Sequence, residues 1–125
     1  MATPNDGLNQ KADKKTRPVH VFAIPESLAN GTTSVGMVTL TAEEELLAWK
    51  RSRGENARLA TELVKASLAE VNGEPVTLHD GSVDAFWKDL HPKIRQLVLT
   101  AYADLHAAEE DDQKAFLASR RVKVG

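Results

Sequence analysis

The chain has 125 residues, a formal net charge of −2 and a sequence pI near 6.1, with 42% hydrophobic and 27% charged residues. These values are ordinary for a soluble globular chain and leave room for one domain with a modest core. The near-neutral charge predicts no general attraction to nucleic acid or to an anionic membrane surface. The absence of cysteine excludes disulfides, thiolate metal sites and thiol catalysis.

Beyond Met1, residues 1–17 contain one large apolar side chain, Leu8, among small, polar and charged residues. Such a segment cannot bury enough apolar surface to offset the entropy of ordering. It predicts a disordered, mildly basic arm on a single small α+β domain that covers residues 18–125. The arm lacks the hydrophobic stretch of a secretory signal, and no apolar run in the chain is long enough to span a bilayer. We therefore expect a cytoplasmic protein.

An N-terminal β-hairpin is predicted by two apolar segments around a turn. The first, PVHVFAIP at residues 18–25, is rich in β-branched and aromatic side chains and closes on a proline. A turn cluster, ANGTTS, separates it from SVGMVTL at residues 34–40, which predicts the second strand. The connection of roughly ten residues is longer than in most hairpins.

A helix is predicted from Thr41, where the apolar period changes. Thr41 and Glu44 have the spacing of a capping box. Acidic residues fill the first turn and basic residues the last, as the helix dipole favours, and Gly54 is a natural stop.

A second helix is predicted over residues 55–71, with Asn72 and Gly73 ending it, and a short strand or extended segment at Val76–Leu78. The apolar side chains at helical spacing are Leu59, Leu63, Val64, Leu68 and Val71.

Further helices follow to the end of the chain. Ser82 has the position of a cap for a helix of about two turns, and Pro92 that of a first-turn proline. A last helix is predicted from an acidic first turn, residues 109–112, to a basic end. The predicted fold class is α+β, an N-terminal β-hairpin followed by a bundle of four to five short helices. The helix after Pro92 has a continuous apolar stripe: Ile94, Leu97, Val98, Ala101, Tyr102 and Leu105.

The histidines do not form a recognisable catalytic or metal site. His91 and His106 are fifteen residues apart, about 22 Å along one straight helix, and cannot share a metal ion. His106 has helical spacing to Glu109 and Glu110, which permits a two-ligand metal face, but nothing indicates a third ligand.

The remaining motifs of enzymes and nucleic-acid-binding proteins are also missing. The acidic runs EEE and EEDD fall in first turns of helices, where consecutive carboxylates point apart, and the calcium-loop pattern does not occur. No nucleophile or phosphate-loop motif is present in the right context. Basic segments lack interleaved aromatic residues. We predict no enzymatic activity, no catalytic residue, no cofactor, no metal, and neither nucleic acid nor membrane as a partner.

The order of several short motifs resembles that in the tail assembly chaperones of tailed bacteriophages, over Pro18 to Val124. The motifs are LTAEEE at Leu40 to Glu45, VNG at Val71 to Gly73, WKDLHPK at Trp87 to Lys93, AY at Ala101-Tyr102 and FLAS at Phe116 to Ser119.

This resemblance implies a small, mostly helical protein without enzymatic activity, present in the bacterial host cytoplasm during phage assembly. Members of that family bind the tape measure protein, whose long apolar helices would otherwise aggregate, and help to recruit tail tube subunits. The predicted hairpin departs from the family pattern. It favours the alternative of a virion structural protein, a component of the tail, neck or head–tail connector, that docks through its N-terminal arm and hairpin.

The candidate partner-binding residues are large side chains on the predicted helices. Most should belong to the core, but a small domain has limited volume to bury them all. We expect part of this apolar surface to receive a helix of the tape measure protein, another tail protein or a second copy of the chain. The pattern leaves open which are core and which are interface: Trp49, Leu63, Phe86, Trp87, Ile94, Leu97, Val98, Tyr102 and Phe116.

Overall fold

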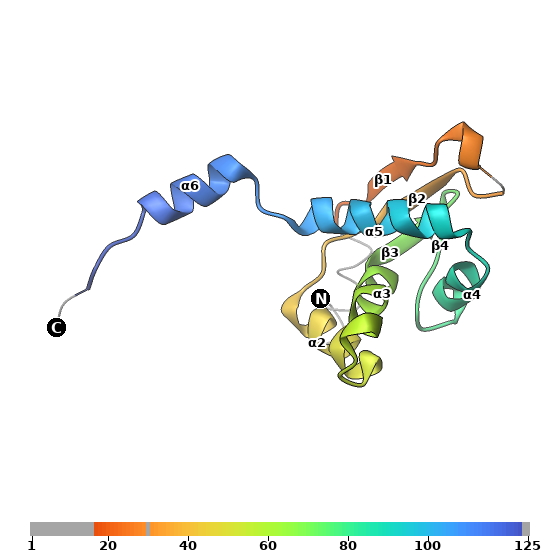
Figure 1. Cartoon of the computed structure of the whole chain (residues 1–125), viewed down its shortest axis with the longest axis horizontal. Coiled ribbons are helices and arrows are strands. Elements are labelled where there is room, and N and C mark those ends of the chain that lie inside the picture. The colour runs from red at the N-terminus through yellow and green to blue at the C-terminus, as the bar shows by residue number, and fades with distance from the viewer. Residues whose placement is uncertain (1–16, 30, 124–125) are drawn as a thin grey trace, which may run out of the picture.

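The computed structural model describes residues 17–29 and 31–123 and has an α+β fold (Figure 1). The predicted fold class is confirmed, since an antiparallel hairpin opens the domain and helices make up most of the rest. The predicted arm falls on residues outside this range, except for Arg17. The elements are β1 (His20–Ala23), the 3-10 helix η1 (Glu26–Leu28), β2 (Ser34–Met37), α2 (Ala42–Ser52), α3 (Asn56–Ser67), β3 (Leu68–Val71), β4 (Glu74–Pro75), α4 (Ser82–Lys88), α5 (Pro92–His106) and α6 (Glu110–Ala118).

The four strands form one antiparallel sheet in the order β1-β2-β3-β4. In the N-terminal hairpin His20 pairs with Met37 and Ala23 with Ser34, which leaves a connection of the predicted length. The helical hairpin α2–α3 is inserted between β2 and β3, so the two central strands of the sheet are far apart in sequence.

The predicted second helix is wrong at its C-terminal end. It stops at Ser67, and residues 68–71 form strand β3 instead. Asn72 and Gly73 have φ angles of 55° and 81°, and they connect Val71 to Glu74 as a two-residue hairpin turn. Positive φ at both central residues is the geometry that Asn-Gly adopts most readily. The dipeptide therefore forms the turn that joins β3 to β4, and it does not end a helix.

The Asn72 side chain joins this turn to the loop between β1 and β2. Its Oδ1 accepts hydrogen bonds from the Thr33 amide at 2.7 Å, the Thr33 hydroxyl at 3.0 Å and the Ser34 amide at 3.3 Å. Its Nδ2 donates to the Gly31 carbonyl at 2.7 Å. Two loops at the same end of the sheet are thus held together by one side chain.

Two further local predictions are resolved by the structure. Of the strand or extended segment predicted at residues 76–78, the strand does not form, because β4 ends at Pro75 and the chain turns away after one more backbone hydrogen bond, from the Val76 amide to the Ala69 carbonyl. Ser82 is the first residue of α4 and not its cap, which is Gly81. The Ser82 hydroxyl instead accepts from the Thr77 amide at 2.8 Å and so fixes the preceding turn.

Helix α2 begins and ends as predicted. The Glu44 amide donates to the Thr41 hydroxyl at 3.2 Å, and the Glu44 carboxylate accepts from the Thr41 amide at 2.9 Å, which completes the capping box. At the other end Arg53 and Gly54 both have positive φ and turn the chain into α3. Pro92 likewise occupies the first turn of α5, as predicted.

The hydrophobic core lies between the sheet and one face of α3, α4 and α5 (Figure 1). Each of these elements contributes at least one buried apolar side chain to the core. These are Val35 and Met37 from β2, Val64 from α3, Leu68 from β3, Val83 and Trp87 from α4, and Ile94 and Val98 from α5.

Helix α6 extends away from this body after a three-residue connection, residues 107–109 (Figure 1). Every residue of α6 is exposed, including Phe116 and Leu117. In the described part of the chain no helix is long and apolar enough to cross a membrane.

Candidate functional site

The nine predicted partner-binding residues do not form one surface. Exposed fractions of 51%, 37% and 76% place Trp49, Leu97 and Phe116 at the surface, on three different helices. The buried ones complete the core, and one of them, Val98, also lines an apolar groove. The buried members are Trp87, Ile94 and Val98, and the half-buried members are Leu63, Phe86 and Tyr102.

An apolar groove of about 360 Å³ lies between β1 and α5. Leu97 and Val98 in its lining were predicted as partner residues, whereas Phe22 and Ile24 of the hairpin were not. The alternation of the first strand was the available signal, because it places Phe22 and Ile24 on the same face. The groove is lined by Phe22, Ala23, Ile24, Pro25, Val35, Leu97, Val98, Thr100, Ala101 and Asp104.

Strand β1, which borders this groove, is an edge of the sheet. Within the described residues no strand pairs with the outer side of β1. Val21, a residue of this strand, is 63% exposed. The opposite edge, β4, has two residues and includes Pro75, which cannot donate to a further strand. The accessible sheet edge and the apolar groove therefore lie on the same side of the domain.

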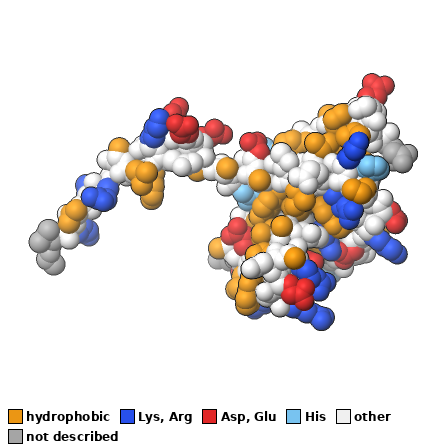
Figure 2. Space-filling model, in the orientation of Figure 1, with side chains coloured by type: hydrophobic (Ala, Val, Ile, Leu, Met, Phe, Trp, Pro, Cys, Tyr) orange, Lys and Arg blue, Asp and Glu red, His pale blue; other side chains and the backbone are white. Residues whose placement is uncertain are grey.

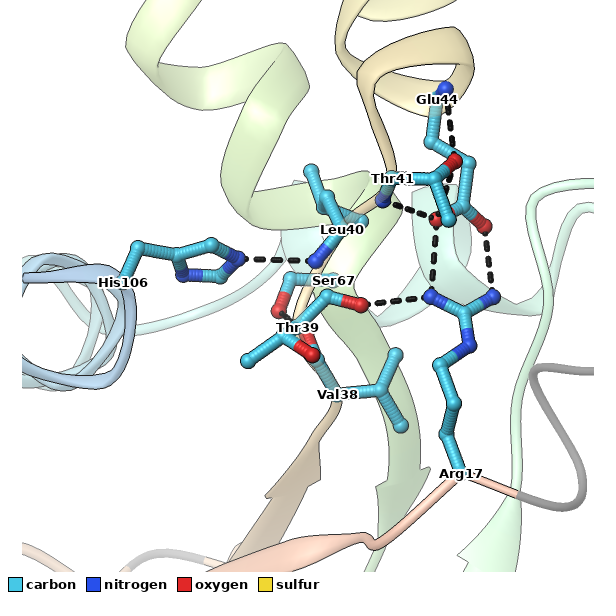
Figure 3. A network of polar contacts seen from close by, with 8 residues as sticks. All are labelled: Arg17, Val38, Thr39, Leu40, Thr41, Glu44, Ser67 and His106. Carbon is cyan, nitrogen blue, oxygen red and sulfur yellow. Dashed lines mark hydrogen bonds and ion pairs between the residues drawn. The ribbon is translucent and has the colours of Figure 1, made fainter.

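His106 connects α5 to the start of α2 (Figure 3). Its Nε2 accepts a hydrogen bond from the Leu40 amide at 2.9 Å, so its Nδ1 carries the proton and donates to the Tyr102 carbonyl at 2.9 Å. The two rings of Tyr102 and His106 are stacked with centroids 4.1 Å apart. Both ring nitrogens are thus engaged, and the described residues contain no group of three or more His, Asp or Glu side chains that could hold a metal ion.

Arg17 is fixed on the same junction by Glu44 (Figure 3). Its two terminal nitrogens donate to the two carboxylate oxygens at 2.8 and 2.9 Å, and one also donates to the Thr39 carbonyl. Burial favours the protonated form of the Glu44 carboxyl, but hydrogen bonds from Arg17 and from Thr41, together with the Arg17 charge, outweigh it and lower the pKa of Glu44. These contacts join three segments at one junction: Arg17, the start of α2 and the end of α5.

The charge on Glu44 should make stability depend on pH in the acid range. Because the folded-state pKa lies below the unfolded one, the carboxylate stabilises the fold above the unfolded pKa, and this is lost as pH falls through the folded pKa. We expect Glu44→Gln to lower the free energy of unfolding by about 1–2 kcal/mol at pH 7. The difference from wild type should shrink below about pH 4.

Urea unfolding of both proteins, followed by circular dichroism across this pH range, measures the effect. Glu74→Gln, at an exposed position on β4, is the matched control and should change little at any pH. A Glu44→Gln deficit that is the same in acid as at neutral pH would contradict the ion-pair explanation.

Comparisons of the chain with protein families, curated proteins and solved structures find no match in any of the three. Functional clues lie in the motifs of the sequence and in the described surface of the domain. On that surface the groove between β1 and α5 is a largely apolar hollow, since its lining includes one ionisable side chain, Asp104.

Proposed function

We propose that this chain is a non-enzymatic tail assembly chaperone of a tailed bacteriophage, and that it binds an apolar helix of the tape measure protein. The observation that carries the proposal is the apolar groove between β1 and α5. The resemblance of its motifs to tail assembly chaperones, from the capping box at Thr41 to the segment around Phe116, supplies the identity of the partner.

The lining of the groove suits one face of an amphipathic helix. Leu97 and Phe22 stand at its two walls, while Ile24, Val35 and Val98 form an apolar floor. Peptide helices that dock in grooves do so through apolar anchors spaced three or four residues apart. Covering such anchors keeps a long apolar helix from associating with other copies of itself, which is what a chaperone of this kind must do.

Co-expression tests the proposal directly. The partner to use is the product of the neighbouring downstream gene, if that gene encodes a very long, helical, apolar-rich protein. We expect this partner to be soluble only in the presence of the chain, and the two to copurify. Leu97→Asp places a charge on the wall of the groove and should abolish both effects, because the carboxylate would lose its hydration against an apolar helix.

The matched control is Leu117→Asp, the same change at an exposed position on α6, away from the groove. It should leave solubilisation unchanged. A partner that stays insoluble with the wild-type chain, or that is solubilised equally well by Leu97→Asp, would exclude the groove as its binding site.

Mass spectrometry of purified virions separates the chaperone from a virion structural protein. A chaperone acts during assembly and should be missing from finished particles. Stoichiometric amounts of the chain in virions would instead support the structural alternative, in which the hairpin and the arm dock against neighbouring subunits.

A further inference from the structure

An asparagine–glycine pair lies where two loops of the sheet meet. The chain has two such pairs, Asn30-Gly31 and Asn72-Gly73, and Asn30 lies outside the described residues. Asn72 and Gly73 are both exposed and form the turn between β3 and β4 (Figure 1). Asparagine is a thermolabile residue, and it is most labile before glycine, because no side chain then shields the next amide nitrogen. Beyond its neighbours in the chain, nothing lies within 4 Å of where a Cβ on Gly73 would stand.

The reaction open to this pair is cyclisation, and it consumes only water. The Gly73 amide nitrogen gives up its proton to solvent base and forms a bond to Cγ of Asn72. The bond from Cγ to Nδ2 breaks, and Nδ2 takes up a proton and leaves as ammonia. Water then opens the five-membered imide at either of its two carbonyls, which leaves aspartate or isoaspartate at position 72.

The turn geometry holds the two reacting atoms apart. Ring closure needs Cβ of Asn72 and the nitrogen of Gly73 on the same side of the bond from Cα to the carbonyl carbon. The φ angles of 55° and 81° are those of a type I′ turn, in which ψ of the first central residue is about 30°. In an L-residue this ψ sets Cβ and the next nitrogen nearly opposite each other. Asn72 must therefore leave the turn conformation before it reacts.

The hydrogen bonds of the Asn72 side chain add a second barrier. Nδ2, the leaving group, donates to the Gly31 carbonyl at 2.7 Å. Oδ1 accepts from the Thr33 amide and hydroxyl and from the Ser34 amide. Rotation of the side chain toward Gly73 breaks these four bonds. The contacts that join the two loops thus also keep the side-chain amide away from its nucleophile.

We propose that Asn72 is a self-modification site that the fold keeps closed, and that it reacts with Gly73 only when this end of the sheet opens. The change is one-way. Aspartate cannot donate to the Gly31 carbonyl, and isoaspartate adds one backbone carbon between β3 and β4, so neither product restores the whole bridge. A chain that has reacted is therefore permanently loosened at this end. The inference involves neither the groove nor its occupant and is independent of the proposed function.

Peptide mapping by mass spectrometry tests this inference on the full chain, incubated with and without guanidinium chloride. In denaturant both Asn-Gly pairs should react at similar rates, which gives the intrinsic rate. In the folded chain Asn72 should react at least about thirtyfold more slowly, because four hydrogen bonds must break first. Isoaspartate in the Asn72 peptide identifies the cyclic route, since direct hydrolysis by water gives aspartate alone.

Thr33→Val isolates the contribution of the side-chain bonds. It removes the hydroxyl that donates to Asn72 Oδ1 at 3.0 Å, at an exposed position, and keeps the bond from the backbone amide. The rate at Asn72 in the folded chain should rise about two- to tenfold, and the rate in denaturant should not change. Thr32→Val is the near control. Leu117→Asp on α6 is the distant control, because Figure 2 shows that helix extending from the body. Both controls should keep the wild-type rate.

Equal rates at Asn72 in the folded and the denatured chain would overturn the inference, because the fold would then give no protection. So would a denatured chain in which no isoaspartate forms at position 72. A Thr33→Val chain that circular dichroism shows to be folded, but that reacts at the wild-type rate, would also overturn it, since the bridge would not be what holds the amide.

Discussion

Val98→Asp is expected to abolish cooperative folding, while Leu97→Asp, one residue earlier on α5, leaves the domain folded. The Val98 side chain has no exposed surface, and Leu97 is 37% exposed. A carboxylate at position 98 would have to lose its hydration in the core between α5 and β2, at a cost of more than about 4 kcal/mol. At position 97 it stays in water, and the change should cost less than about 1 kcal/mol.

Circular dichroism and urea unfolding of the two variants measure this contrast. Val98→Ala provides a graded comparison, since it removes two buried methyl groups and should cost about 1–3 kcal/mol. If both aspartate variants unfolded, Leu97 would belong to the core, and the groove would be a packing feature of the fold. If both folded normally, the position of α5 against the sheet would be wrong.

Asn72→Ala should lower the free energy of unfolding by about 2–3 kcal/mol. The change removes all three hydrogen bonds to Oδ1 and the one from Nδ2, and it places alanine at a φ of 55°. Both effects act at the same end of the sheet, where the turn of β3 and β4 meets the loop from β1. Urea unfolding gives the size of the loss.

Asn72→Asp is the matched variant, because aspartate also tolerates positive φ and keeps the acceptor oxygen. It loses the donor to the Gly31 carbonyl and should cost about 1 kcal/mol. An alanine variant as stable as wild type would mean that neither the turn geometry nor the bridge between the two loops contributes to stability.

The sequence predicted those elements whose signals are local. The capping box at Thr41 and Glu44 and the first-turn proline at Pro92 are each contained within one helical turn, and both are present in the structure. The N-terminal hairpin was predicted in the same way, from two short segments and the turn residues between them.

Strand β3 was missed because its apolar residues continue the helical period of α3. Leu68 and Val71 are three residues apart, which continues the helical stripe of α3 without a break. What overrides that stripe is pairing with β2, a strand more than thirty residues earlier, and local periodicity does not report such a contact. The dipeptide Asn72-Gly73 is the signal for a hairpin turn between β3 and β4, but the same two residues also fit the end of a helix.

The division between core and surface within the candidate residues was not available from the sequence either. Leu97 and Val98 are neighbours of similar character, and only the position of the sheet decides which one is covered. Phe22 and Ile24 became part of the candidate groove for the same reason, since α5 lies across the hairpin.

The insertion of α2 and α3 into the sheet has a consequence for how the domain folds. The chain leaves β2 at Val38 and returns to β3 at Leu68, and the excursion is closed at its base by the Val38 amide donating to the Ser67 carbonyl and the Ser67 hydroxyl to the Val38 carbonyl. Two adjacent helices form and pair quickly, because their contacts are short-range. Once paired, they would hold the ends of β2 and β3 together and replace a slow search over a long loop by a fast local step. We therefore expect the helical hairpin to form before the central strands pair.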